Sequence, residues 1–228
     1  KIADDQMEEV VRTALDAGYC AFDTAYFYGN EKALGSALKH SNVERDELFI
    51  TSKLWNDYQG YDQTIEYFNK SLDNLGLDYL DLFLIHWPCE NDQLYIESYK
   101  ALEHLYEEGK IKAIGVCNFK IHHLEKLMRE TKITPQVNQI ELHPYFNQQD
   151  VQDFCDEHDI KVTAWMPLMR NKGLLDDPVI TDIAHRYDKT PAQIVLRWHL
   201  AHNRIIIPKS QTPQRIKENF DIFDFNLE

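Results

Sequence analysis

The sequence has few features of a membrane protein, a nucleic-acid binder or a secreted protein. No apolar run approaches the roughly 20 residues that a membrane-spanning helix needs. Basic residues number 24 against 38 acidic ones, and the net charge of −14 argues against general nucleic-acid binding, although it allows a local basic pocket for a phosphate. The four cysteines include no Cys-x-x-Cys pair, and no pair of His or Cys residues has zinc-ligand spacing. These cysteines are Cys20, Cys89, Cys117 and Cys155. We therefore expect reduced thiols, no metal and a cytoplasmic location.

The glycine-rich signature of a dinucleotide-binding Rossmann fold is also missing. No Gly-x-Gly-x-x-Gly follows any strand-like run, which weakens the prediction of a doubly wound sheet. Hydrophobic residues make up 43% and charged residues 27% of the 228 residues, as is usual for a globular protein. We expect residues 1–228 to form a single domain.

Apolar, strand-like runs alternate with amphipathic, helix-like stretches along the whole chain. Strands are expected over residues 20–25, 48–54, 80–86, 113–118, 136–142, 161–166 and 205–208. Helices are expected over residues 4–17, 30–40, 62–75, 93–108, 120–130, 148–158, 190–202 and from about 213, with a long loop after 167. Such alternation predicts a parallel sheet covered by helices.

Seven strand–helix units suit a (β/α)8 TIM barrel without its first strand better than a doubly wound sheet. A closed barrel needs a further strand before Lys1, so we expect the N-terminal strand to be missing from this chain. Asn30 is expected to cap the second helix, and Gly18 to end the first. Thr190 and Pro191 together predict the start of a late helix.

Three successive strand-like runs each end in a polar residue. Asp23 ends the first, Lys53 the second and His86 the third, while Tyr28 lies in the loop after the first. Each residue alone also has a structural explanation. Asp23 suits a loop or helix-cap position, and Tyr28 suits an aromatic side chain that packs in the fold. Lys53 suits a side chain whose ammonium reaches solvent, and His86 suits a hydrogen-bonded core histidine. An ionised Asp inside a barrel is costly unless it is paired, and Lys53 is its available partner. Because the C-terminal strand ends form the active site of such barrels, the four together predict a catalytic site.

The chemistry that these four side chains allow is specific. A tyrosine with its ordinary pKa of ~10 is a poor acid at neutral pH, and a nearby Lys53 ammonium is expected to lower that pKa. Asp23 would keep Lys53 charged and in place, and His86 would donate a hydrogen bond to a carbonyl oxygen. Together they would polarise a carbonyl group and protonate the alkoxide formed when hydride arrives. No side chain supplies hydride, so a nicotinamide cofactor is expected.

Three motifs resemble those of the aldo-keto reductase superfamily. Asp23-Thr-Ala-x-x-Tyr28-Gly-Asn-Glu31 resembles the first signature of the family, and Leu77-Asp-Tyr-Leu-Asp-Leu-Phe-Leu-Ile-His-Trp-Pro88 its second. Ile207-Pro-Lys-Ser-x-Thr-Pro-x-Arg-Ile-Lys-Glu-Asn219 resembles the third, which binds the adenosine 2′-phosphate. The segments 115–119 and 137–144 are also similar to the family, so the resemblance covers essentially the whole chain.

The resemblance implies a role for each matching residue. Asp23, Tyr28, Lys53 and His86 would be the catalytic tetrad, with Tyr28 as the general acid. The residues implied to hold NADPH or NADP+ are Cys117, Asn118 and Gln139 at the carboxamide, Trp165 on the nicotinamide ring, Pro167 and Leu168 in the following loop, and Lys209, Ser210, Thr212, Arg215, Glu218 and Asn219 at the adenosine end. Trp55, Trp87 and His86 would line the substrate pocket.

Three positions depart from the common pattern. Cys117 stands where many members have Ser, and a thiol is a weaker hydrogen-bond donor. Trp165 stands where many have Tyr, as in bacterial members similar to 2,5-diketo-D-gluconate reductases. Met166 replaces a frequent Ser near the cofactor phosphates. The C-terminal tail that usually closes over the substrate is absent from the sequence as given.

The sequence thus predicts a monomeric, NADPH-dependent reductase of small carbonyl compounds, keto-sugars among them, with no nucleic-acid or membrane partner. Lys209 and Arg215 predict a preference for NADPH over NADH. One alternative is a non-catalytic, NADP-binding regulatory protein, like the channel-associated members of the superfamily. Another is a lyase that uses Lys53 as a Schiff base, which Asp23 disfavours by keeping Lys53 protonated.

Overall fold

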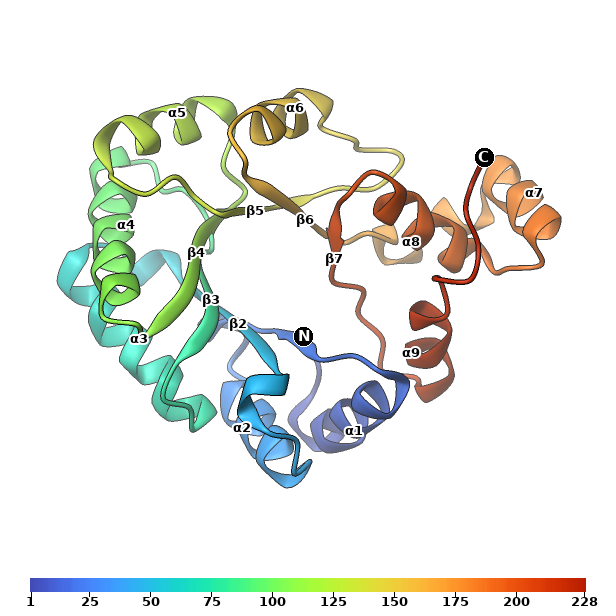
Figure 1. The fold of residues 1–228 in the computed structure, drawn as a ribbon, viewed down its shortest axis with the longest axis horizontal. Helices are drawn as coiled ribbons and strands as arrows, with labels where there is room; N and C mark the ends of the chain where they lie inside the picture. The colour runs from blue at the N-terminus through green and yellow to red at the C-terminus, as the bar shows by residue number, and fades with distance from the viewer.

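Seven parallel strands form a curled sheet in which each strand pairs with the next one along the chain (Figure 1). The structure, a computed structural model, describes residues 1–228 except for the side chain of Asn171. The strands are β1 Ala21–Asp23, β2 Phe49–Leu54, β3 Leu80–Ile85, β4 Ile111–Cys117, β5 Val137–Glu141, β6 Lys161–Trp165 and β7 Ile205–Ile206. The helices lie outside the curled sheet, so the predicted barrel of parallel strands covered by helices is confirmed.

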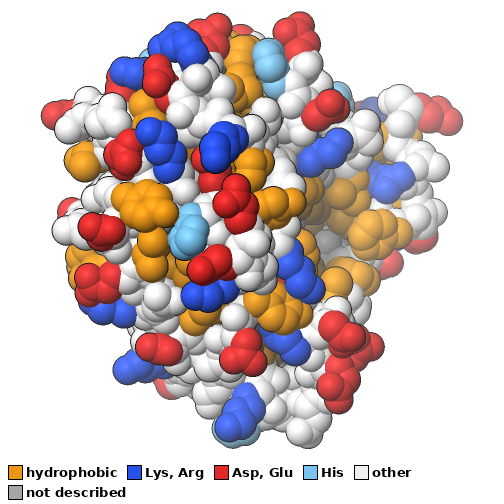
Figure 2. All heavy atoms as spheres, turned by 60° about the vertical axis from the view of Figure 1, so that its left-hand side comes forward, with side chains coloured by type: hydrophobic (Ala, Val, Ile, Leu, Met, Phe, Trp, Pro, Cys, Tyr) orange, Lys and Arg blue, Asp and Glu red, His pale blue; other side chains and the backbone are white. Residues whose placement is uncertain are grey.

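The helices follow the strands in the order expected for a barrel. They are α1 Met7–Ala17, α2 Glu31–His40, α3 Tyr61–Leu75, α4 Asp92–Glu107, α5 Ile121–Glu130, α6 Gln149–Glu157, α7 Pro178–Tyr187, α8 Pro191–Ala201 and α9 Pro213–Phe220. Short 3-10 turns are η1 Asp4–Gln6, η2 Tyr26–Tyr28, η3 Arg45–Glu47, η4 Asn56–Tyr58, η5 Met169–Asn171 and η6 Leu174–Asp176. Within the described residues, none of the helices is long and apolar enough to cross a bilayer. On the face drawn in Figure 2, acidic and basic side chains are mixed rather than segregated.

Helix α7 is absent from the sequence-based prediction, which placed a long loop after Pro167. The start of α7 carries the same signal as the start of α8: Asp177 Oδ1 accepts a hydrogen bond from Val179 N at 2.8 Å, and Pro178 is the first helical residue. Ile180 and Ala184 are the buried residues of α7, and Ile183 and Tyr187 are partly buried beside them. It packs with α8 and the C-terminal segment in a small cluster that is separate from the main core of the barrel.

The first motif contains residues whose task is structural. Glu31 is buried at the start of α2, where it accepts hydrogen bonds from Ser52 Oγ at 2.6 Å and Asn74 Nδ2 at 3.0 Å. Helices α2 and α3 approach so closely that a Cβ on Gly35 would lie 2.2 Å from the carbonyl oxygen of Leu75. These contacts fix α2 against β2 and α3, and so position the loop between β1 and α2.

Asn30 has the position but not the capping interaction predicted for it. It precedes α2, yet its side chain makes no cap hydrogen bond. Asn30 Oδ1 instead accepts from Thr24 Oγ1 at 2.9 Å, and Asn30 Nδ2 donates to the carbonyl oxygen of Ile2 at 3.1 Å. Gly18 does end α1 with a left-handed backbone, as predicted.

Candidate active site

The ends of β1, β2 and β3 bring the four predicted catalytic residues together. The parallel register places Asp23 opposite Thr51 and Lys53 opposite Leu84, so that the three strand ends are neighbours. Lys53 Nζ donates hydrogen bonds to Asp23 Oδ1 and, at 2.8 Å, to the carbonyl oxygen of Thr24. The ring centroid of Tyr28 lies 5.4 Å from Lys53 Nζ and 5.7 Å from the ring centroid of His86.

Lys53 is a fully buried ammonium group held by a carboxylate. Burial is the largest single influence on its pKa and lowers it, but the charges of Asp23, Tyr28 and Cys117 together outweigh burial and raise the pKa above its ordinary value. The expectation that Asp23 keeps Lys53 charged agrees with this balance. A permanently protonated Lys53 is a poor nucleophile, which disfavours the Schiff-base alternative.

The expectation that Tyr28 has a lowered pKa is wrong in its net direction. Lys53 does pull the pKa of Tyr28 down, but burial of the phenol raises it by more, and the charge of Asp23 adds to the rise. The Tyr28 side chain therefore holds its proton throughout the neutral range. The sequence showed the charged partner but could not show how deeply the phenol is buried.

His86 is a neutral imidazole at neutral pH. Burial, followed by the positive charge of Lys53, lowers its pKa from 6.5 to about 3. A neutral imidazole has one N–H donor and one acceptor nitrogen. His86 can therefore donate a hydrogen bond to a carbonyl oxygen, but it is not an imidazolium that could act as a general acid at neutral pH. This is the state that the predicted role requires.

The two amides predicted to hold the nicotinamide carboxamide lie beside the tetrad. Gln139, on β5, donates from Nε2 to Asp23 Oδ2 at 2.9 Å. Asn118, just after β4, donates from Nδ2 to the carbonyl oxygen of His86 at 3.0 Å, and its Oδ1 accepts from Trp165 Nε1 at 2.8 Å. Cys117 is buried next to Lys53, and burial raises the pKa of its thiol, which therefore stays protonated.

The loops after β6 and β7 carry the residues predicted for the rest of the cofactor. Met166, Met169 and Arg170 all have positive φ angles, between 48° and 53°, which is unusual for residues with side chains and is typical of functional loops. Arg170 and Lys209 are both cationic, and both lie near Lys1. This concentration of positive charge, in a chain of net charge −14, suits a phosphate.

The adenosine-end residues are spread along the segment that leads into α9. Lys209, Thr212 and Arg215 are exposed, and Ser210 Oγ accepts from Thr212 N at 3.2 Å. Glu218 Oε1 accepts from Thr190 Oγ1 at 2.8 Å and so fastens α9 to the start of α8. Asn219 is buried. Pro167 contacts His199 through its carbonyl oxygen, and Leu168 packs against the cluster that contains α7.

Aromatic rings flank the tetrad at the mouth of the barrel. Trp55 lies edge-on to His86, with ring centroids 5.3 Å apart, and Trp87 lies edge-on to Trp165 at 6.5 Å. Sequence reasoning did not single out Phe27, whose ring stacks on Trp55 at 3.7 Å and is 57% exposed. The available signal was the aromatic run Tyr26-Phe27-Tyr28 in the turn that follows the first strand. The rings form an apolar wall at the predicted substrate site.

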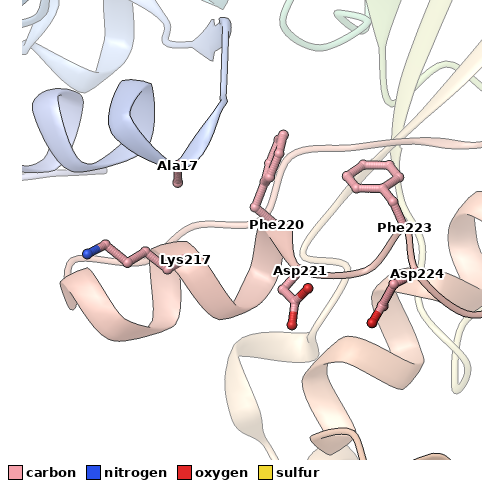
Figure 3. Close-up of a pocket in the computed structure, with 6 residues that line it drawn as sticks. All are labelled: Ala17, Lys217, Phe220, Asp221, Phe223 and Asp224. Carbon is pink, nitrogen blue, oxygen red and sulfur yellow. The ribbon is translucent and has the colours of Figure 1, made fainter.

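An open surface groove of about 550 Å³ lies elsewhere in the fold, between the end of α1 and α9 (Figure 3). It is lined by Ala17, Lys217, Phe220, Asp221, Phe223 and Asp224. None of these residues belongs to the predicted catalytic or cofactor set. The groove is therefore separate from the residues considered for the chemistry at the barrel mouth.

Comparison with known proteins agrees with this geometry. The model of the Aldo/keto reductase family matches residues 1–228. The chain belongs to this family. The glyoxal reductase of Bacillus subtilis is 50% identical over 98% of this chain and 80% of its own length. The methylglyoxal reductase DkgA of Escherichia coli K12 is 48% identical over 99% of this chain and 82% of its own length.

A solved structure of this family carries the expected cofactor. A mutant of Gox0644 in complex with NADPH has 43% sequence identity to this chain and superimposes with a TM-score of 0.95, covering all of this chain and 82% of that one. The predicted superfamily and barrel fold are thus confirmed, and so is the prediction of an oxidoreductase of the aldo-keto reductase type. The roles of individual site residues remain predictions.

Proposed function

We propose that this chain reduces aldehydes and ketones to alcohols with NADPH. The observation that carries the proposal is the buried Lys53–Asp23 pair beside Tyr28 and a neutral His86, at the C-terminal ends of adjacent barrel strands. The relatives named glyoxal reductase and methylglyoxal reductase support small carbonyl compounds, with α-dicarbonyls first among them and keto-sugars next. The apolar wall of Phe27 and Trp55 is compatible with short, uncharged substrates.

Each member of the tetrad has a defined part in this reaction. When bound, NADPH supplies the hydride. His86 donates a hydrogen bond to the carbonyl oxygen, and Tyr28 transfers its phenolic proton to that oxygen as it becomes an alkoxide. Lys53 stabilises the phenolate that remains, and Asp23 keeps Lys53 charged. Solvent then returns a proton to Tyr28.

The cofactor-binding residues fit NADPH in the chemistry of their side chains. Asn118 and Gln139 supply amides for the carboxamide, with Cys117 beside them, and Trp165 supplies an aromatic face for the nicotinamide ring. The loop of Pro167 and Leu168 would run beside the phosphates. Lys209, Ser210, Thr212, Arg215, Glu218 and Asn219 would hold the adenosine end. The positive charge shared by Arg170 and Lys209 supports a phosphate in this region.

The variant Tyr28→Phe tests the assignment of the general acid. It should bind NADPH like the unmodified protein, measured by quenching of tryptophan fluorescence, and should reduce methylglyoxal no faster than background. A turnover close to that of the unmodified protein would refute the role of Tyr28. An unmodified protein that binds NADPH but turns over none of a panel of aldehydes would favour the non-catalytic, NADP-binding alternative.

The preference for NADPH over NADH rests on Lys209 and Arg215. Arg215→Ala should weaken binding of NADPH and leave binding of NADH almost unchanged, because only NADPH carries the 2′-phosphate. Equal effects on both cofactors would show that Arg215 does not read the phosphate. A monomeric state, a cytoplasmic location, a single domain and the absence of nucleic-acid or membrane partners remain predictions from the sequence.

A further inference from the structure

Gln139 contacts a member of the catalytic tetrad directly. Its Nε2 donates to Asp23 Oδ2 at 2.9 Å, while the other oxygen of that carboxylate, Oδ1, accepts from Lys53. The two residues are 116 positions apart, on β5 and β1, so the bond crosses the interior of the barrel. Gln139 is 4% exposed. A hydrogen bond to a charged group in such a buried place is among the stronger ones in proteins.

Asn118 provides the contrast within the same predicted cofactor site. Its amide is bonded to the backbone oxygen of His86 and to the indole of Trp165. Neither of these bonds reaches Asp23 or Lys53. Of the two amides predicted for the carboxamide, only Gln139 is thus bonded to the carboxylate that holds the catalytic lysine.

We propose that Gln139 is a positioning residue for the proton transfer from Tyr28 and acts through Asp23. This inference rests on the proposed function and deepens it. By donating to Oδ2, Gln139 fixes the rotation of the carboxylate so that Oδ1 alone faces Lys53. Lys53 has three N–H donors, of which two are used by Asp23 and Thr24 in the described structure. The third stays available for the oxygen of Tyr28.

The same side chain can still serve the cofactor. A glutamine amide has two N–H donors and one acceptor oxygen, and the bond to Asp23 uses only one donor. The second N–H and the oxygen remain for a carboxamide. Gln139 therefore links the place where the nicotinamide is expected to bind to the group that sets the acidity of Tyr28.

Loss of the Gln139 amide should alter the balance of charges at Tyr28. In Gln139→Met, Asp23 Oδ2 loses its donor, and the remaining strong donor nearby is the Lys53 ammonium. Lys53 would be drawn further onto the carboxylate and away from Tyr28. Since Lys53 lowers the pKa of Tyr28 and Asp23 raises it, the phenol should become a weaker acid.

The experiment compares Gln139→Met with Asn118→Gly as a matched amide control. Glycine is chosen at position 118 because Asn118 has a φ of 62°, which glycine tolerates without strain. Three quantities are measured: the Kd for NADPH by tryptophan quenching, the pH profile of kcat at saturating NADPH, and the titration of Tyr28 in the cofactor-free protein. The last uses NMR of tyrosine labelled with carbon-13 at Cζ, with the Tyr28 resonance assigned by its loss in Tyr28→Phe.

Both variants should weaken NADPH binding, but only Gln139→Met should affect the proton donor. We expect Gln139→Met to lower kcat at saturating NADPH roughly tenfold. The basic limb of the pH profile of kcat, and the pKa of Tyr28 measured by NMR, should both move upward by about half a pH unit or more. Asn118→Gly should change neither the basic limb of the kcat profile nor the pKa of Tyr28.

The inference is overturned if Gln139→Met changes only the Kd for NADPH. It is also overturned if both variants shift the Tyr28 titration equally, because the effect would then be a general disturbance of the site. Should the unmodified protein reduce no carbonyl compound, the proposed function fails by itself. The NMR titration of the cofactor-free protein would still decide whether Gln139 controls Tyr28.

Discussion

Two largely buried ion pairs lie at opposite ends of the strands β2 and β3. At the C-terminal end, Lys53 pairs with Asp23, and their side chains are 0% and 14% exposed. At the N-terminal end, Arg45 pairs with Asp81 at 2.8 Å, and their side chains are 24% and 8% exposed. Both pairs join segments that are distant in the sequence, yet only the first is expected to take part in chemistry.

The pair at the N-terminal end is held by the backbone around it through both terminal nitrogens of Arg45, while Arg45 Nε is buried without a partner. Arg45 Nη1 and Nη2 donate to the carbonyl oxygens of Leu48 and Tyr79, each at 3.0 Å. Asp81 Oδ2 also accepts from the backbone N–H of Ile50 at 2.9 Å. The planar fork of the guanidinium suits this set of fixed acceptors. This pair therefore fastens the starts of β2 and β3 together, and it explains Asp81 in the second motif as structural.

The pair at the C-terminal end keeps capacity for another partner. Lys53 uses two of its three N–H donors on Asp23 and Thr24, and Tyr28 lies within reach of its charge. An ammonium on a flexible stem can shift toward a developing phenolate, whereas a guanidinium held by backbone carbonyls cannot. Burial alone does not distinguish the two pairs. What distinguishes them is that the donor left over on Lys53 belongs to a flexible ammonium beside the phenol of Tyr28.

Removal of Lys53 should give the largest effect on activity. In Lys53→Met no cation remains to stabilise the Tyr28 phenolate, so kcat at saturating NADPH should fall by roughly 10²- to 10⁴-fold. Circular dichroism checks that the variant is folded, and Asp81→Ala serves as the comparison at the other end of the strands. A Lys53→Met protein with activity within about tenfold of the original would contradict a catalytic role for the pair.

Removal of Asp81 should give the largest effect on stability. Asp81→Ala leaves Arg45 without its carboxylate and Ile50 N without its acceptor, which should cost about 3 kcal/mol of unfolding free energy. Urea denaturation measures this cost, and kcat per folded molecule should not change. A cost below about 1 kcal/mol would place Arg45–Asp81 among the weak, surface-like pairs.

Lowering the pH should destabilise the protein through the C-terminal end of the strands. The pKa of His86 is about 3 in the folded chain and 6.5 as the ordinary value, so between these values the unfolded chain binds a proton that the folded chain does not. This contribution to stability is present above 6.5 and is lost as the pH falls toward 3. Urea denaturation at a series of pH values measures it.

The variant His86→Asn shows how much of the pH dependence of the unfolding free energy comes from His86. His86→Asn should flatten it, while Asp81→Ala, being far from His86, should retain the slope of the original protein. His199 also has a pKa lowered to about 3, mainly by burial, so part of the slope should survive in His86→Asn. An unchanged slope in His86→Asn would mean that His86 is protonated equally in both states.

Lys112 should give the smallest effect. Its ammonium group lies 4.0 Å from Asp81 Oδ1 and 4.3 Å from the ring centroid of Tyr79, but the side chain is largely exposed. Lys112→Met should therefore change the unfolding free energy by less than about 0.5 kcal/mol. A larger loss would show that Asp81 depends on both cations, and the contrast with Arg45 would need revision.

The sequence predicted the parts of the fold that have a strong local pattern. The strand β3 is apolar at nearly every position because both of its faces are buried, and the helices α1 and α3 show a clear apolar stripe. The missed helix α7 carried the same signals as the helices that were predicted. Asp177 and Pro178 mark its start, and Val179, Ile180, Ile183, Ala184 and Tyr187 recur at helical spacing.

The candidate site was predicted from the order of its residues, not from their contacts. Parallel strands must place Asp23, Lys53 and His86 at one end of the barrel, and this follows from alternation alone. Three features did not follow: the stacking of Phe27 on Trp55, the bond from Gln139 to Asp23, and the raised pKa of Tyr28. Each depends on distances between segments that are far apart in the chain.

The sequence by itself determined the alternation of strands and helices, the end of the barrel at which the polar residues gather, and the family to which the chain belongs. Only the tertiary structure decided how those residues share protons and charge. Burial raises the energy of every charged form, and its extent depends on what the rest of the chain places around a group. For that reason Lys53 stays charged, His86 stays neutral and Tyr28 keeps its proton, although no local pattern in the sequence determines these states.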